Sequence, residues 1–590
     1  CYFIERTQKC TKLFFNHYIE KKKYNCSATY DVTFKPKQFT ASDTICGLTT
    51  SVAATGHKLN ADDICQYCNH SFFRYTTSDG KIVEKIKNQE QFGANIVAHS
   101  VVDGKCVIEF DAPITKIPAN AFYNKNSLTG SLVIPNSVTE IGEQAFGNCT
   151  GLNGTLTLSS KLGKIGQYAF YGCTGFTGSL KLPSSLTDIG IAAFVICKSF
   201  TSLELSNTLS VIPGSAFRGC VGLSGSLVIP DGVKEIGANA FLGCTGFNGT
   251  LTLSNKLETI GESAFNGCTG FTGSLTLPSS VTTIGQSAFK ACRSFTKLEL
   301  PNTLSVIPTQ AFMLCRSLSG ELVIPASVTE IGNHAFYDCQ NLSAETRQVT
   351  LPKSLKKIGE NVFRSSNNIH TVNFLSLPEG ISGNLGYKKK AVSLSDESYI
   401  SDQASGTVDE ISYTRKMSNN WGTLVLPYSL TLTGDEPYRL YSIDNMTGEE
   451  LVLKQLEGEV AAGTPCVVKR NDTEAKLTFD ANNAELNMAI DRKTVGDMTF
   501  HGTYTTENVS SGYVISKDCF WNVTELNGST LVKGVKVSPF RAWLDGNAAN
   551  GPARLAMRID GSTTGINTPD ALDVLNDAEA ESTQILRPQR

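Results

Sequence analysis

Short alternations of apolar and polar residues recur along the middle of the chain, and each is followed by a proline or a turn. In one of them, Leu132 and Ile134 alternate with a serine and a valine. This period of two predicts a short strand with one buried face. Pro135 ends the strand, since a proline has no N–H to donate to a ladder. Gly142 then precedes an Ala-Phe pair. A helical or 3-10 turn is expected there, because other units carry proline at the glycine position.

The unit repeats at two levels. The stretch that starts at Gly130 returns 95 residues later from Gly225, and a third copy starts at Gly320. Within each copy, a cysteine follows the Ala-Phe pair every 23 or 24 residues. These nine are Cys149, Cys173, Cys197, Cys220, Cys244, Cys268, Cys292, Cys315 and Cys339. Repeats of this length stack, because one unit cannot bury its apolar face alone. The sequence therefore predicts a mainly β solenoid of parallel strands.

Outside the repeats the pattern changes. After Phe374 a stretch rich in serine, glycine and charge follows, and short alternating runs between Trp421 and Ile559 predict an antiparallel β-sandwich. The last 30 residues contain many acidic and many small residues, and this composition favours disorder. We expect six parts: a Cys-rich N-terminal element (1–74), a cap segment (75–103), the solenoid (104–380), a transition (381–418), the β-sandwich (419–560) and a disordered tail (561–590).

The repeat pattern L-x-I-P-x-S-V-x-x-I-G-x-x-A-F-x-x-C resembles the leucine-rich repeats of the BspA-like surface proteins, also called the Treponema pallidum type, over residues 101–374. Upstream YTTSDGKIVE and downstream GEVAAGTPCVVKR resemble flanking segments of such proteins from the Bacteroidales. The resemblance implies a leucine-rich-repeat solenoid. It also implies an exported protein, extracellular or on the cell surface in association with the outer membrane. Some members are implicated in adhesion to host matrix proteins or to other bacteria.

Charge and hydropathy narrow the classes of partner. The chain has 52 basic and 55 acidic residues, a net charge of −3, so no global field favours nucleic acid or an anionic membrane. No apolar run approaches 18 residues, so no transmembrane helix is encoded. The Lys388–Lys390 triplet is expected to be solvated loop charge. Attachment of the protein to the cell envelope is compatible with this composition.

The cysteines suggest one candidate metal site. Cys65 and Cys68 are two residues apart, with Cys46 and His57 upstream, and two thiolates with a distant cysteine and histidine match a tetrahedral structural zinc site. Disulfides and reduced thiols are the alternatives, and zinc is the one cofactor that the sequence suggests. The nine repeat cysteines are expected to be buried thiols that act as packing.

The outward positions of the predicted sheet, which begin at Glu109, are rich in hydroxyl groups, weakly charged and free of aromatic residues. Candidate binding residues on this concave face are Thr157, Lys181, Glu204, Thr252, Thr276 and Glu299. The functional interpretation is a low-affinity, multivalent protein-binding surface. The plainer interpretation is that threonine and valine are good residues for an exposed strand.

Motifs of catalysis are missing from the sequence. It has no HExxH pair, no G-x-S-x-G elbow and no phosphate-binding loop. We therefore expect a non-enzymatic, adhesin-like surface protein that binds host extracellular-matrix proteins or other cell-surface proteins through its repeats. The alternative is a structural spacer that displays a glycan-binding C-terminal β domain.

Overall fold

The computed structural model describes residues 60, 64–65, 68–386, 388–417, 419–447, 450–471, 476–516, 519–528, 535–546, 552–559, 562–563 and 583–585. The described chain is mainly β and forms two compact units. The first holds the described residues up to Leu304, together with 308–320 and 335–341. The second holds 305–307, 321–334 and the described residues from Leu342 onward. In the part that the structure describes, no helix is long and apolar enough to cross a membrane.

A small antiparallel sheet begins the first unit. Its strands, in spatial order, are β2 (Ile96–Val102), β3 (Lys105–Phe110), β1 (Ser71–Thr77) and β5 (Leu128–Thr129), and a 3-10 turn, η3 (Gln89–Gln91), lies between β1 and β2 in the chain. Phe73 on β1 is fully buried, with its ring centroid 5.4 Å from that of Phe122. This sheet therefore covers the first aromatic ring of the repeat core.

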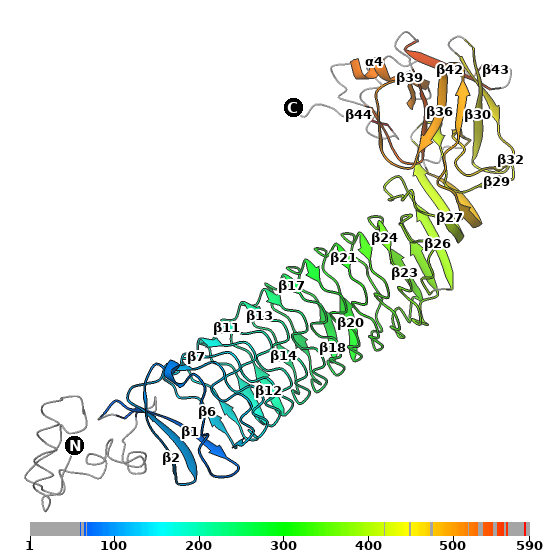
Figure 1. Cartoon of the computed structure of the whole chain (residues 1–590). Coiled ribbons are helices and arrows are strands. Elements are labelled where there is room, and N and C mark those ends of the chain that lie inside the picture. The colour runs from blue at the N-terminus through cyan, green and yellow to red at the C-terminus, as the bar shows by residue number, and fades with distance from the viewer. Residues whose placement is uncertain are drawn as a thin grey trace, which may run out of the picture. The chain divides into compact units, whose positions relative to one another are not determined.

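Two rows of parallel strands run along the coils of the first unit, one behind another (Figure 1). The first strand row is β6 (Leu132–Val133), β8 (Leu156–Thr157), β10 (Gly178–Lys181), β12 (Phe200–Glu204), β14 (Leu227–Val228), β16 (Leu251–Thr252), β18 (Gly273–Thr276) and β20 (Phe295–Glu299). These strands pair in parallel, as β6 with β8 and β14 with β16. The strand expected around Leu132 is thereby confirmed.

The second strand row was not expected from the sequence. It contains β4 (Lys116–Ile117), β7 (Glu140–Ile141), β9 (Lys164–Ile165), β11 (Asp188–Ile189), β13 (Val211–Ile212), β15 (Glu235–Ile236), β17 (Thr259–Ile260) and β19 (Thr283–Ile284). Each strand buries its isoleucine, so the inward apolar positions were assigned correctly. Because these strands are two residues long, they leave no alternation for a pattern to detect.

The expected helical turn after Gly142 is wrong, because this segment is a run of turns. Gln144 and Asn148 have φ values of 52° and 59°, in the left-handed region that interrupts a right-handed helix. The N–H groups of Gln144 and Phe146 instead donate to Gln167 and Ala169 of the next coil, at 2.9 and 2.8 Å. The N–H groups of Ala145 and Gly147 donate three residues back, to Gly142 and Gln144. Single turns thus alternate with hydrogen bonds between coils, and no continuous helix forms.

Stacked aromatic rings fill the interior of the first unit. Ten phenylalanines from Phe122 to Phe336 stack with centroids 5.2–5.8 Å apart and planes within 12° of parallel. The nine repeat cysteines are at most 1% exposed, which confirms that they are interior residues. Each Sγ donates to a phenylalanine carbonyl of the preceding coil at 3.0–3.2 Å. The thiols thus satisfy carbonyl groups as well as filling space.

Parallel strands also begin the second unit. Strands β21 (Val306–Ile307), β22 (Glu330–Ile331) and β24 (Lys357–Ile358) pair in parallel, and a further sheet has the order β23 (Gln348–Leu351), β25 (Thr371–Phe374), β26 (Lys389–Leu394), β27 (Gly406–Lys416) and β34 (Lys476–Leu486). Strands β23 to β27 are parallel, whereas β34 is antiparallel to β27. The segment 381–418, expected to be a polar transition, therefore extends the parallel sheet.

The burial of Lys390 explains why strand β26 could not be predicted from the sequence. It is 7% exposed, so its expected place in a solvated loop is wrong. The side chain lies on the inward side of β26 with Val392 and Leu394, and its Nζ donates to the Thr407 carbonyl at 3.1 Å. A buried lysine of this kind breaks the apolar alternation that marks a strand in sequence.

The C-terminal β region of the second unit is a single large sheet. Its spatial order is β28 (Trp421–Leu424), β33 (Cys466–Arg470), β30 (Tyr438–Thr447), β31 (Glu450–Gln455), β42 (Arg554–Ile559), β39 (Cys519–Asn522), β38 (Tyr513–Ser516), β41 (Arg541–Asp545), β36 (Met498–Thr503) and β35 (Arg492–Val495), with β43 (Ser562–Thr563) beside β42. The remaining elements are the pair β29 (Leu430–Leu432) and β32 (Gly458–Val460), the sheet of β37 (Glu507–Val509), β40 (Val535–Val537) and β44 (Thr583–Ile585), and the helix α4 (Val523–Gly528).

This region differs from the expected antiparallel sandwich in its connections. Strands β31 and β42 are parallel, and the sheet curls so that Thr423 Oγ1 on β28 donates to the Ala542 carbonyl on β41 at 2.7 Å. Apolar residues from both halves of the sheet form one core, which includes Trp421 and Phe500. The tail expected to be disordered, 561–590, contributes the short strands β43 and β44.

A buried polar cluster joins the parallel strands of the second unit to the large sheet. Arg541 on β41 is 1% exposed, and its Nη2 lies 2.8 Å from Asp396 Oδ2. Its Nη1 donates to the hydroxyl of Tyr413 on β27 at 2.5 Å, and that hydroxyl in turn donates to Asp396. A buried charge that is paired and hydrogen-bonded in this way is costly to break.

Candidate binding surface

The six candidate binding residues end or lie near the ends of strands in the first strand row. In β8 and β16 the preceding leucines, Leu156 and Leu251, point inward and are 5% and 6% exposed. Because side chains alternate along a strand, Thr157 and Thr252 point outward and are exposed. Lys181, Glu204 and Thr276 are likewise exposed, and Glu299 is half-buried. The structure thus places all six on the outward side of one strand row.

Two of the candidates form an ion pair. Lys181 and Glu204 are register partners on β10 and β12, and Nζ lies 2.8 Å from Oε1. Their side chains are 67% and 60% exposed, so solvent screens the pair and it contributes at most about 1 kcal/mol to stability. Both charges remain available to a partner that approaches this face.

A second group forms around Glu299. Thr276 Oγ1 donates to Glu299 Oε2 at 2.9 Å, and the Nζ of Lys297 lies 2.6 Å from Oε1. The hydrogen bonds from Lys297 and Thr276 hold the pKa of the Glu299 carboxyl below its usual value. This carboxylate is therefore ionised over the whole neutral range. The six candidates fall into separate groups along the strand row rather than one cluster.

Exposed valines complete this surface, although the sequence analysis did not count them among the candidate binding residues. Val133 and Val228 are 49% and 58% exposed, and they are register partners of Thr157 and Thr252. The two Val–Thr pairs are 95 residues, or four coils, apart, which is about 19 Å along the stack. The signal that could have identified them is the return of an apolar residue at an outward position in both copies.

The outward face of the second strand row is also charged, and sequence reasoning missed it. Lys116 Nζ lies 2.9 Å from Glu140, and Lys164 Nζ lies 3.4 Å from Asp188, on the four neighbouring strands β4, β7, β9 and β11. Opposite charges alternate along the stack and pair with one another. The first four strands of this face therefore present self-paired charges, whereas its next four strands are mostly neutral, with Val211, Thr259 and Thr283 at the outward position.

Glu109 corrects the expected outward row at its N-terminal end. It was expected to face solvent, but it is 3% exposed and its Oε1 lies 2.6 Å from His70 Nδ1. Strand β1 pairs with β3 and places Phe72 beside Glu109. The outward surface consequently begins only after this sheet.

The candidate zinc ligands are only partly placed. Cys65 and Cys68 are both buried, and the Asn69 N–H donates to the Cys65 carbonyl at 3.1 Å. Cys46 and His57 lie outside the described residues. Among the residues that are described, no three or more histidine, cysteine, aspartate or glutamate side chains gather closely enough to hold a metal ion. The zinc site remains a prediction.

Comparison with known proteins identifies the repeats. A family model described as "BspA type Leucine rich repeat region (6 copies)" matches residues 115–248, 245–370 and 320–387. No curated protein matches the chain. The chain is similar in structure to a leucine-rich repeat protein from Bacteroides ovatus, with 25% identity over 45% of this chain and 83% of the other and a TM-score of 0.32. It is also similar to a leucine-rich cell surface protein from Faecalibacterium prausnitzii, with 26% identity, the same coverage and a TM-score of 0.30.

A third similar structure comes from a spirochaete. The T. pallidum leucine-rich repeat protein shares 28% identity over 31% of this chain and 71% of its own, with a TM-score of 0.23.

Proposed function

We propose that this chain, whose residues 115–387 match the BspA type leucine-rich repeat model, is an exported surface protein that binds other proteins through its first strand row. The partners would be host extracellular-matrix proteins or proteins of other cell surfaces. The cell-surface description of the similar Faecalibacterium protein supports the location that we propose.

The observation that carries this proposal is the recurrence of one exposed surface. Val133 with Thr157, and Val228 with Thr252, form small neutral patches four coils apart. Each is followed along the stack by charged residues, which include Glu204 and Glu299. Apolar side chains that stay half exposed in a folded protein are available to become buried against a partner.

Repetition compensates for the weakness of each patch. A single valine and threonine bury little area and contain none of the tryptophan, tyrosine or arginine residues that dominate strong interfaces. When one patch is bound, the second meets its target at a high effective concentration, because both are fixed on the same rigid stack. We therefore propose binding by avidity to partners that present repeated or clustered epitopes.

Substitution of the exposed valines tests this proposal in the full chain. Immobilised matrix proteins are presented to wild-type protein and to Val133→Thr, Val228→Thr and the double variant, and binding is followed by biolayer interferometry. Each single change should weaken binding by a few-fold, and the double change should weaken it by more than the product of the two, since avidity is lost. Val211→Thr is the matched control, because Val211 is 40% exposed but lies in the second strand row.

The control separates a specific surface from general apolar stickiness. Equal loss of binding in the Val211→Thr variant would mean that the second strand row matters as much as the first, which contradicts the proposal. Unchanged binding in the double variant would favour the alternative in which the repeats act as a spacer.

A further inference from the structure

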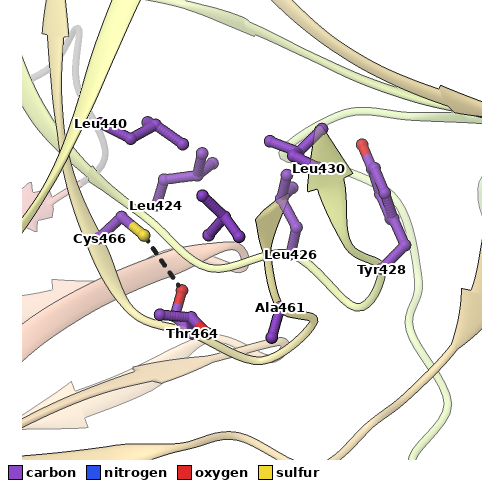
Figure 2. Close-up of a pocket in the computed structure, with 9 residues that line it drawn as sticks. Leu424, Leu426, Tyr428, Leu430, Leu440, Ala461, Thr464 and Cys466 are labelled. Carbon is purple, nitrogen blue, oxygen red and sulfur yellow. Dashed lines mark hydrogen bonds between the residues drawn. The ribbon is translucent and has the colours of Figure 1, made fainter. Parts of the chain in front are cut away.

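The C-terminal β region contains two cavities of very different kinds. One is an apolar void of about 10 Å³, lined by residues such as Leu424, Leu426 and Cys466, whose thiol donates to the Thr464 carbonyl (Figure 2). It has room for at most a single water molecule and offers almost no polar partner. The other is a polar hollow of about 250 Å³ at the open end of the β30–β31 hairpin, lined by the segments that connect β29 to β30 and β31 to β32. Since a single water molecule needs about 10–15 Å³ of a volume measured in this way, the hollow has room for a small ring with its substituents.

The second cavity, which we call the hairpin hollow, lies where two pairs of strands diverge. Strands β29 and β32 pair from Leu430 to Leu432, and β30 and β31 pair beside them from Tyr441 onward. The loop from Leu432 to Glu436 forms one wall, and the turn from Gln455 to Gly458 forms another. The hollow therefore belongs entirely to the second unit and does not depend on the repeat surface.

The first wall is held in one conformation by a carboxylate. Glu436 Oε1 accepts hydrogen bonds from the N–H and the hydroxyl of Thr433, at 2.5 and 3.0 Å, and Oε2 accepts one from Gly434 N–H at 3.0 Å. Gly434 has a φ of 94°, which side chains rarely adopt. A loop fixed by three hydrogen bonds loses little entropy when a ligand binds, so the hollow is preorganised.

Two side chains in the hollow keep hydrogen-bonding capacity that the protein does not use. Arg439 Nη1 donates to the carbonyls of Glu436 and Tyr438, at 3.0 and 2.9 Å, which fixes the guanidinium. Among the described residues, Arg439 Nε and Nη2 and the hydroxyl of Tyr438 have no hydrogen-bond partner. Burial raises the pKa of the Tyr438 phenol, so its hydroxyl stays a donor at neutral pH. Gln455 and Glu457 add exposed acceptors on the opposite wall.

We propose that the hairpin hollow binds one neutral saccharide ring. A sugar ring presents several hydroxyl groups that each donate and accept, which suits a fixed hollow with unused donors on one wall and acceptors on the other. Arg439 and Tyr438 donate to sugar oxygens, and Glu457 accepts from a sugar hydroxyl. The walls carry two carboxylates, Glu436 and Glu457, against one guanidinium, so the charge balance disfavours an acidic sugar.

Saturation-transfer NMR on the full chain tests this site. Glucose, galactose, mannose and N-acetylglucosamine are the neutral probes, and glucuronic acid is the acidic counterpart of glucose. At least one neutral sugar should receive saturation, with the millimolar affinity usual for a single small ring, and glucuronic acid should bind more weakly. Arg439→Met should weaken binding by about tenfold and Tyr438→Phe by about fivefold, since each removes a donor.

The variants are chosen so that misfolding cannot imitate the result. Tyr438→Phe keeps the buried ring and removes only the hydroxyl, and Arg492→Met is the matched control because Arg492 is an exposed arginine on the edge strand β35. Thermal unfolding of each variant checks the fold. Three results would overturn the proposal: no neutral sugar binds the wild type, both hollow variants bind as well as the wild type, or glucuronic acid binds as tightly as glucose.

Discussion

Raising the pH above 9 is expected to destabilise the repeat coils, because their buried thiols must ionise when the chain unfolds. Burial raises the pKa of Cys149, Cys244 and Cys315 from the ordinary value of 9.0 to about 12, and it raises the pKa of the other repeat thiols that are fully buried well above 9.0. Because the pKa of each thiol is higher in the folded state than in the unfolded state, the folded chain binds more protons than the unfolded chain at any pH between these two pKa values. Stability is therefore fully present below pH 9 and falls as the pH rises toward 12.

The size of the loss follows from the proton count. At pH 10, one unit above the unfolded pKa, each protected thiol has lost about 1.4 kcal/mol of stabilisation. If the nine repeat cysteines behave alike, the sum is roughly 13 kcal/mol, which is as large as the net stability of many domains. Tyr413 and Tyr428 also have pKa values raised by burial, but from an ordinary value of 10.0, so their contribution starts one unit higher.

The Cys244→Ala variant isolates one thiol. Removing the sulfur costs about 1 kcal/mol for the small buried group and about 0.5 kcal/mol for its hydrogen bond. The hydrogen-bond cost is small because the Phe217 carbonyl keeps a second donor, the N–H of Cys220 at 3.2 Å. The variant should be about 1.5 kcal/mol less stable than the wild type at pH 7. It should be nearly as stable as the wild type at pH 10, where the wild type has one more thiol to ionise.

Urea unfolding followed by far-UV circular dichroism at pH 7, 9 and 10 measures this convergence. In parallel, alkylation of the native protein, mapped by mass spectrometry, measures how accessible each repeat thiol is to the reagent. A constant difference between the variant and the wild type across this pH range would refute the reasoning. So would rapid labelling of Cys244 in the native protein at pH 7, because a thiol that is 0% exposed cannot meet the reagent.

Three further outcomes are expected. Phe241→Ala should destabilise the first unit by about 4 kcal/mol in urea unfolding, since this ring stacks between two others, whereas Ile191→Ala, at a position 52% exposed, should change stability by less than about 0.5 kcal/mol. Arg541→Met should lower the free energy of unfolding of the second unit by about 3 kcal/mol. Unfolding can be followed by tryptophan fluorescence, because all three tryptophans lie in the C-terminal β region, and an unchanged unfolding midpoint would contradict the role given to the buried cluster. If zinc binds, purified protein should carry about one zinc per chain and Cys65→Ser should lose it, whereas mass spectrometry of a disulfide at Cys65 would exclude the metal.

Most of the repeat fold could be predicted because each coil states the same pattern again. A single Leu132-x-Ile134 alternation is weak, but its return in successive units, with a cysteine at a constant position, assigned both the strand and the buried thiols. The turns after Gly142 could not be assigned, since the left-handed positions are occupied by residues as different as Tyr168 and Ile196, with φ of 54° and 61°. Stacking between coils imposes those conformations, and composition does not reveal them.

The candidate site was predictable only in outline. Alternation identified the outward positions, yet the grouping of Lys181 with Glu204 depends on the register between coils. Glu109 was misplaced because the strand that covers it lies before the repeats in the chain. Nothing in the sequence distinguishes Tyr438 and Arg439 of the hairpin hollow from ordinary strand residues. Their unused donors become visible only when the two loops are placed in space.

The identical register of the two repeat copies has a consequence for how the gene can change. Leu132 pairs with Leu156 as Leu227 pairs with Leu251, so a coil in one copy meets the same neighbours as its counterpart in the other. Recombination between the two copies would delete or add 95 residues, that is four whole coils, and keep the register between neighbouring coils. The length of the array is therefore a trait that can vary among strains in steps of about 19 Å without any change in the way the protein folds.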